Sequence, residues 1–171
     1  MNIPFHIPYT LQESTLSVQN LIDNPASLEH KKNIQDCVDY FQQLYPGYKA
    51  LMTTSCTRAL ELIALAIDLK AGDEVILPSY TYVGVANAFA NTGASLVFVD
   101  IDPSNMNMDP DCVVKAITAK TKAIVAMHYA GVSCAIDKIR EIADKHQIKL
   151  VEDNAQGIHS TFNGQLLGSF G

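Results

Sequence analysis

The stretch from Leu150 to Gly157 has residue types and a spacing that could do chemistry. An apolar run ending at Val151 predicts a short buried strand; Asp153 follows it, and Gln156 comes three residues later. Ligands of parallel α/β sheets bind at the carboxyl ends of the strands. A carboxylate fixed there could pair with a protonated ring nitrogen of a cofactor. The alternative is that Asp153 only caps the next turn or helix.

A second polar run, residues 53–57, stands between a predicted strand over 48–52 and a predicted helix over 58–69. Hydroxyl side chains at such a turn cap helices. The free backbone N–H groups at the same helix end can also hold a phosphate. The sequence leaves both interpretations open for Cys56 and Thr57.

Tyr82 lies shortly after a predicted strand over 74–77, which Pro78 terminates. An aromatic side chain just past a strand end can belong to the core, or it can form a platform for a flat ring. Together with Cys56, Thr57 and Asp153, it would offer a phosphate seat, a stacking ring and a partner for a ring nitrogen. That arrangement requires a fold that brings the strand ends to one edge.

Strands and helices alternate along most of the chain, and the predicted strands are continuous apolar runs. This pattern predicts an α/β fold with a mostly parallel sheet and helices on both faces. Pro4, Pro8 and Pro25 predict an irregular amino-terminal arm over residues 1–27, so the domain is expected to span 28–171. The expected elements are strands at 96–99, 121–127 and 148–151, helices at 28–44, 83–91, 110–118 and 135–146, and an Asn-Gly hairpin over 158–167.

Composition excludes several classes of function. The 171 residues are 48% hydrophobic and 18% charged, with a formal net charge of −6, which argues against a nucleic-acid surface. There is no long apolar span, and residues 1–12 do not resemble a signal peptide. The four cysteines have no CxxC spacing and the five histidines no HxxxH pair, so we expect a cytoplasmic protein without a metal site or disulfides.

Five collinear segments resemble one known family. They are TTSCTRALEL, GDEVILPSYTYVGVANAF, FVDIDPSNMNMD, AIVAMHYAGVSC and LVEDNAQG. Together they look like the amino-terminal half of the sugar aminotransferases that depend on pyridoxal 5'-phosphate (PLP), the DegT/DnrJ/EryC1/StrS family. The match runs from about residue 48 to 171. The forms MHYAGVSC and PSYTY are most similar to members that aminate a nucleotide-linked 4-keto-6-deoxyhexose.

The resemblance implies a partial large domain of a fold-type I PLP-dependent transferase. Cys56 and Thr57 match the phosphate-binding turn, Tyr82 the ring that stacks on the cofactor, Asp153 the partner of its ring nitrogen, and Gln156 the residue near its ring hydroxyl. It also implies a homodimer that transfers an amino group, usually from glutamate, to a keto sugar for cell-surface polysaccharide precursors.

Two departures from the family pattern matter. Transamination needs a lysine for the Schiff base, and in this family it lies after the Gly-Ser-Phe-Gly that ends this sequence. The lysines from residue 49 onward begin or precede strands, or lie on or near helices, and none fits: Lys49, Lys70, Lys115, Lys120, Lys122, Lys138, Lys145 and Lys149. We therefore expect an inactive fragment, truncated before that lysine. In addition, residues 24–27 (Asn-Pro-Ala-Ser) replace a glycine-rich turn that relatives have near the substrate.

Two other interpretations belong to different classes. One is a non-catalytic, doubly wound module that holds a phosphorylated ligand with Asp100 and Asp153; the absence of GxGxxG after the first strand argues against a dinucleotide. The other makes Cys56 a nucleophile, because a helix amino terminus can lower the pKa of a thiol.

Overall fold

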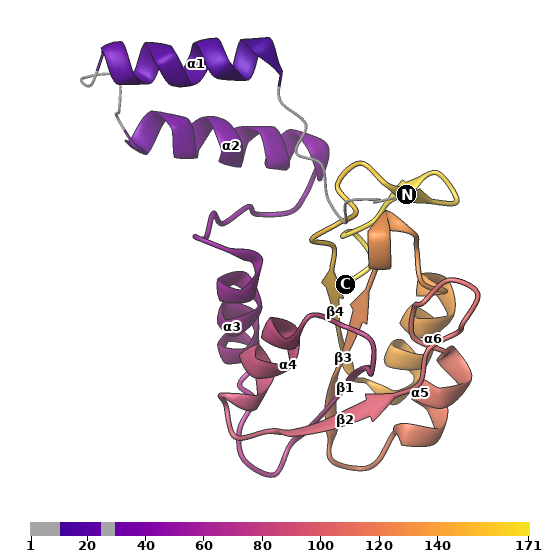
Figure 1. Cartoon of the computed structure of the whole chain (residues 1–171). Coiled ribbons are helices and arrows are strands. Elements are labelled where there is room, and N and C mark those ends of the chain that lie inside the picture. Colours follow the sequence, from indigo (N-terminus) through magenta and orange to yellow (C-terminus); the bar gives the residue numbers. More distant parts are fainter. Residues whose placement is uncertain (1–10, 25–29) are drawn as a thin grey trace, which may run out of the picture. The chain divides into compact units, whose positions relative to one another are not determined.

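The structure is a computed structural model (Figure 1), and it describes residues 11–24 and 30–171. The chain divides after Met52 into two compact units.

The first unit holds two helices, α1 (Gln12–Asp23) and α2 (His30–Leu44). The prediction of an irregular arm is wrong for residues 12–23. The three prolines lie outside this run, which contains neither proline nor glycine, so nothing interrupts its helical hydrogen bonds. An i,i+4 bond from the Gln19 side chain to Asp23 (2.9 Å) also supports the helix. The helix predicted over 28–44 is confirmed from residue 30; residues 28 and 29 lie outside the described part.

The strand predicted over residues 48–52 is also wrong. The segment has no strand assignment, and the backbone N–H of Tyr48 instead donates to the carbonyl of Tyr45 (3.2 Å). An apolar run becomes a strand only when a neighbouring strand accepts and donates its backbone hydrogen bonds. No paired strand contains this segment among the described residues.

The second unit contains a parallel sheet of four strands in the order β2-β1-β3-β4. The strands are β1 (Glu74–Pro78), β2 (Ser95–Val99), β3 (Thr121–Met127) and β4 (Lys149–Asp153). This confirms the predicted parallel α/β fold. The last four residues of β1 and the last five of β3 are buried, which explains their continuous apolar sequences.

Helices cover both faces of this sheet, as Figure 1 shows. On one face, α3 (Cys56–Ala66) and α4 (Val83–Ala90) pack on alternate strand residues such as Val75 and Leu77. On the other, α5 (Pro110–Ala116) and α6 (Ile136–His146) pack on the residue between them, Ile76. Successive strand side chains point to opposite faces, so one apolar strand serves two cores.

Beyond β4 the chain forms the predicted hairpin, with β5 (Thr161–Phe162) antiparallel to β6 (Gln165–Leu166). Asn163 and Gly164 both have positive φ, 50° and 81°, as a two-residue Asn-Gly turn requires. Leu167, the residue after β6, is fully buried in the core on the α5/α6 face. No helix within residues 11–24 and 30–171 is both long and apolar enough to cross a membrane.

Candidate functional site

The carboxyl ends of β1, β3 and β4 meet at one edge of the sheet. Tyr80 and Tyr82 follow β1, His128 follows β3, and Asp153 ends β4. The strands place these side chains there because parallel neighbours all end at the same edge.

Asp153 is a buried carboxylate, with only 3% of the residue exposed. Its Oδ1 accepts a hydrogen bond from the N–H of Ala155 (3.2 Å), so part of its role is the turn stabilisation that the sequence left open. The same oxygen lies 3.6 Å from the Sγ of Cys56. Both contacts use Oδ1, which leaves Oδ2 available to a ligand.

Cys56 is the first residue of α3 and Thr57 the second, after the N-cap residue Ser55. The Ser55 side chain accepts from the N–H of Arg58 (3.2 Å), so one first-turn donor is capped. Those of Cys56 and Thr57 have no acceptor inside the helix. The turn can therefore be capped by Ser55 and still bind an anion through the remaining N–H groups.

The thiol of Cys56 is a poor nucleophile in this setting. Although the residue as a whole is exposed, loss of water around the sulfur, the negative charge of Asp153 and the hydrogen bond to it raise the pKa of Cys56 to about 11. The thiolate is the reactive form, and it is scarce at neutral pH when the pKa is that high. This argues against the interpretation of Cys56 as a catalytic nucleophile.

Tyr82 is not a core residue, since 66% of it is exposed. Its ring lies over the buried Gly84, where an added Cβ would stand 2.5 Å from the ring atom Cε1. The same Cβ position is 2.9 Å from the Oγ1 of Thr57. The glycine thus lets the aromatic ring lie close to the amino terminus of α3.

Gln156 is linked to a different part of the edge. Its Oε1 accepts from the N–H of Ala130 (2.7 Å), in the short 3-10 turn Tyr129–Gly131 that follows β3. Ala130 has a left-handed backbone with φ of 54°, which is costly for a residue with a Cβ. The structure therefore connects Cys56 to Asp153 and brings Thr57 near Tyr82, while Gln156 holds the neighbouring turn.

Sequence reasoning missed Glu152, whose side chain is only 3% exposed. Its carboxylate accepts from His128 Nε2 (3.0 Å) and from the N–H groups of Gly168 (2.8 Å), Phe170 (2.6 Å) and Gly171 (2.6 Å). Burial opposes ionisation of this carboxyl, but the hydrogen bonds outweigh it and hold its pKa below the ordinary value. A charged residue inside an apolar strand was the signal available in the sequence.

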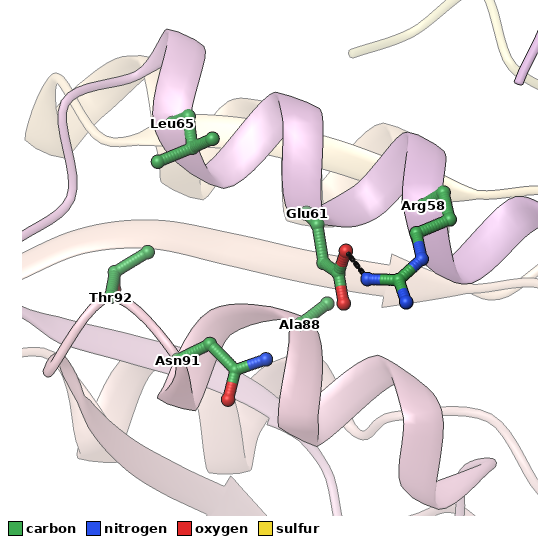
Figure 2. Close-up of a pocket in the computed structure, with 6 residues that line it drawn as sticks. All are labelled: Arg58, Glu61, Leu65, Ala88, Asn91 and Thr92. Carbon is green, nitrogen blue, oxygen red and sulfur yellow. Dashed lines mark hydrogen bonds and ion pairs between the residues drawn. The ribbon is translucent and has the colours of Figure 1, made fainter.

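A separate shallow pocket of about 200 Å³ lies between α3 and α4 (Figure 2). Its lining includes an ion pair between Arg58 and Glu61 beside the exposed Leu65. None of the predicted site residues lines it, so it is not the site formed by the strand ends.

Comparison with known proteins identifies the family. The sequence profile of the DegT/DnrJ/EryC1/StrS aminotransferase family matches residues 12–171. The chain belongs to this family. Its fold is that of the PLP-dependent aminotransferases among the solved structures, which confirms the predicted resemblance.

Individual known proteins are similar to nearly all of this chain. The spore coat polysaccharide biosynthesis protein SpsC of Bacillus subtilis (strain 168) is 32% identical over 169 residues, which cover 99% of this chain and 43% of SpsC. An aminotransferase from Psychrobacter cryohalolentis has a TM-score of 0.87 at 30% identity, covering 96% of this chain and 42% of its own. The PLP form of the putative sugar aminotransferase Spr1654 from Streptococcus pneumoniae has a TM-score of 0.83 at 30% identity, covering 99% and 47%. The chain thus spans less than half the length of these relatives.

Proposed function

We propose that this chain forms the cofactor-holding part of a PLP-dependent sugar aminotransferase. The observation that carries the proposal is the contact between Cys56 and Asp153. It joins the amino terminus of α3, a seat for a phosphate, to a buried carboxylate at the end of β4. A flat, phosphorylated, cationic ring needs both groups within one ligand's length.

The residues present fit this cofactor. The N–H groups of Cys56 and Thr57 would hold its phosphate at the positive end of the α3 dipole. Asp153 offers Oδ2 to the ring nitrogen, and the exposed ring of Tyr82 would cover one face of the cofactor. Gln156 would lie near the ring hydroxyl.

When bound, PLP supplies an electron sink for transfer of an amino group. The chain's own contribution is electrostatic and positional. The carboxylate of Asp153 favours the protonated ring nitrogen, since an opposite charge at hydrogen-bonding distance stabilises the cation. Burial of that carboxylate keeps competing water away from the ion pair.

We propose that the substrates are glutamate, as amino donor, and a nucleotide-linked 4-keto-6-deoxy sugar used for cell-surface polysaccharide. The MHYAGVSC and PSYTY segments support this choice, because they resemble those of dTDP-4-amino-4,6-dideoxygalactose transaminases. The similarity to SpsC and to a putative sugar aminotransferase supports the class of substrate. We place the reaction in the cytoplasm and assign the active form to a homodimer. The substituted glycine-rich turn at 24–27 lies largely outside the described residues.

We further propose that the Schiff-base lysine comes from outside these 171 residues, so that residues 28–171 act as a partial large domain. Within the second unit, three lysines lie at the amino-terminal ends of strands, opposite the site: Lys120, Lys122 and Lys149. The others follow α3 or lie in α5 and α6: Lys70, Lys115, Lys138 and Lys145. None stands at the edge that holds Asp153.

The test is binding of PLP to the purified chain, measured by equilibrium dialysis and by absorbance. We expect saturable binding that Asp153→Asn weakens at least about tenfold, as loss of a charged hydrogen bond should. Asp100→Asn is the matched control, because Asp100 follows β2 at the same edge and only the phosphate-module interpretation, which uses Asp100 together with Asp153, gives it a contact with the ligand. Equal loss in both variants, or no saturable binding, would contradict the proposal. If borohydride reduction attached the cofactor covalently to one lysine of this chain, the proposal that the Schiff-base lysine lies outside these residues would be wrong.

A further inference from the structure

Two tyrosines that the cofactor site does not use meet at the same edge of the sheet. Tyr80 comes from the segment after β1 and Tyr129 from the turn after β3. Their hydroxyl oxygens are 2.8 Å apart, and their ring centroids lie 4.7 Å apart at an angle of 53°. Tyr80 is 41% exposed and Tyr129 is half-buried, so the pair faces solvent.

The turn that carries Tyr129 is held from two sides. The N–H of Tyr129 donates to Oδ1 of Asn107 (2.8 Å), a buried side chain that in turn donates to the carbonyl of Val132 (3.1 Å). The next N–H, of Ala130, donates to Gln156. Polar side chains from two other segments thus fix a left-handed turn, and backbone strain of this kind collects where geometry matters for function.

The hydroxyl pair leaves one donor unused. Each phenol has a single O–H proton, and one of the two makes the bond within the pair. The other proton has no recorded acceptor among the described residues, although its oxygen is polarised by the bond that it accepts. The pair therefore presents an O–H donor beside two aromatic rings, one of them exposed.

We propose that Tyr80 and Tyr129 form the subsite for the sugar ring of the substrate. The free O–H donates to a sugar oxygen, and the exposed ring packs on the apolar C–H face of the sugar. Gln156 ties this subsite to the cofactor site, since the same side chain that would lie near the cofactor also holds Ala130, the neighbour of Tyr129. This inference rests on the proposed function and names where the sugar binds.

The pair could instead only fasten two loops, and phenylalanine variants separate the two roles. Tyr80→Phe and Tyr129→Phe keep the rings in contact but remove hydroxyls, and each is expected to leave the melting temperature nearly unchanged. If the pair only joins the two loops, removal of either hydroxyl should leave ligand affinity unchanged. The matched control is Tyr48→Phe, an exposed tyrosine of the first unit.

The experiment uses the full chain loaded with pyridoxamine 5'-phosphate, titrated by calorimetry with dTDP-glucose, a stable sugar nucleotide. The chain loaded with PLP is titrated separately with L-glutamate, because the amino donor meets the aldehyde form of the cofactor. We expect the variant that lacks the free O–H to weaken dTDP-glucose binding about three- to tenfold, the loss of one hydrogen bond. The other variant should weaken binding less, because it removes only the hydroxyl that polarises the donor, and the double variant should lose little more than the more affected single one. Cofactor affinity, glutamate affinity and the Tyr48→Phe control should not change.

Unchanged dTDP-glucose affinity in both variants would overturn the inference, and so would weakening confined to glutamate. If the unsubstituted chain binds the cofactor but not dTDP-glucose, the inference fails while the proposed function stands. If it binds no cofactor, the proposed function itself fails.

Discussion

His128 and Glu152 form a buried pair in which Nε2 of the imidazole lies 3.0 Å from Oε2 of the carboxylate. The N–H of Cys134 donates to the other ring nitrogen, Nδ1 (3.3 Å), so the proton of the imidazole lies on Nε2, facing the carboxylate. The pair links the ends of β3 and β4 next to the candidate site. Glu152 thereby holds the backbone from which Asp153 projects.

This pair predicts loss of stability in acid. The folded pKa of Glu152 is lowered, so the unfolded state takes up the proton first as the pH falls, and folding stability decreases. The contribution is complete above the ordinary glutamate pKa of about 4.3 and disappears as the pH falls through the lower folded value. Urea unfolding between pH 7 and 3 should show this slope.

Glu152→Gln should flatten that slope and cost about 3–5 kcal/mol at neutral pH, because three backbone donors and His128 lose their charged acceptor. The exposed Glu141 of α6 provides the control, since Glu141→Gln should change stability by less than about 0.5 kcal/mol. A Glu152→Gln protein with an unchanged acid slope would show that the pair does not set it.

Cys56 should react slowly with iodoacetamide despite its exposure. Its raised pKa of about 11 leaves little thiolate at pH 8, and the charge of Asp153 contributes to that shift. Asp153→Asn should therefore accelerate alkylation of Cys56 by severalfold, whereas the exposed Cys37 of α2 should react at an unchanged rate. Peptide mass spectrometry after timed labelling measures both rates. Faster labelling of both cysteines would instead indicate loosening of the fold.

Gly84→Ala should weaken PLP binding by displacing the ring of Tyr82. The added Cβ would stand 2.5 Å from Cε1 of that ring and 2.9 Å from Oγ1 of Thr57, distances at which something must move. We expect about tenfold weaker binding, and a much smaller effect of the same change in a Tyr82→Ala background. If the effects of the two substitutions were additive, Gly84 would not act by allowing the position of the Tyr82 ring.

Two phenylalanines measure how far the core depends on the α3/α4 face. Phe89 of α4 is fully buried, whereas Phe98 of β2 is 52% exposed. Phe89→Ala should cost about 3–5 kcal/mol in chemical denaturation, and Phe98→Ala much less, since burial sets the loss of transfer energy and the cavity. Comparable losses would imply that β2 is covered in solution.

The sequence was most informative where local pattern decides structure. The continuous apolar run of β3 predicted its bounds, Thr121–Met127, and the Asn163-Gly164 pair predicted the hairpin turn. Prediction from the sequence failed where the structure of a segment depends on a distant segment that pairs with it. Residues 48–52 have strand composition but no paired strand in the described chain. The helix over 12–23 forms because the prolines flank it and none lies inside it.

The site divides in the same way. Asp153 and Cys56 were predicted from their places at a strand end and a helix start, yet their contact joins residues 97 positions apart. Glu152 was missed because its partners lie 16 to 24 residues away in sequence, on His128 and in the segment 168–171. Backbone amides leave no mark in a sequence that identifies which carboxylate will accept from them.

Glu152 and Asp153 are consecutive residues of β4, and their side chains leave the strand on opposite faces. Glu152 accepts from the N–H of Phe170 on the α5/α6 side, and Asp153 meets Cys56 on the α3 side. A single inserted residue anywhere earlier in that strand would exchange the two carboxylates. Glu152 would then point at the candidate site and Asp153 towards the α5/α6 side, so the strand tolerates changes of residue type far better than changes of length.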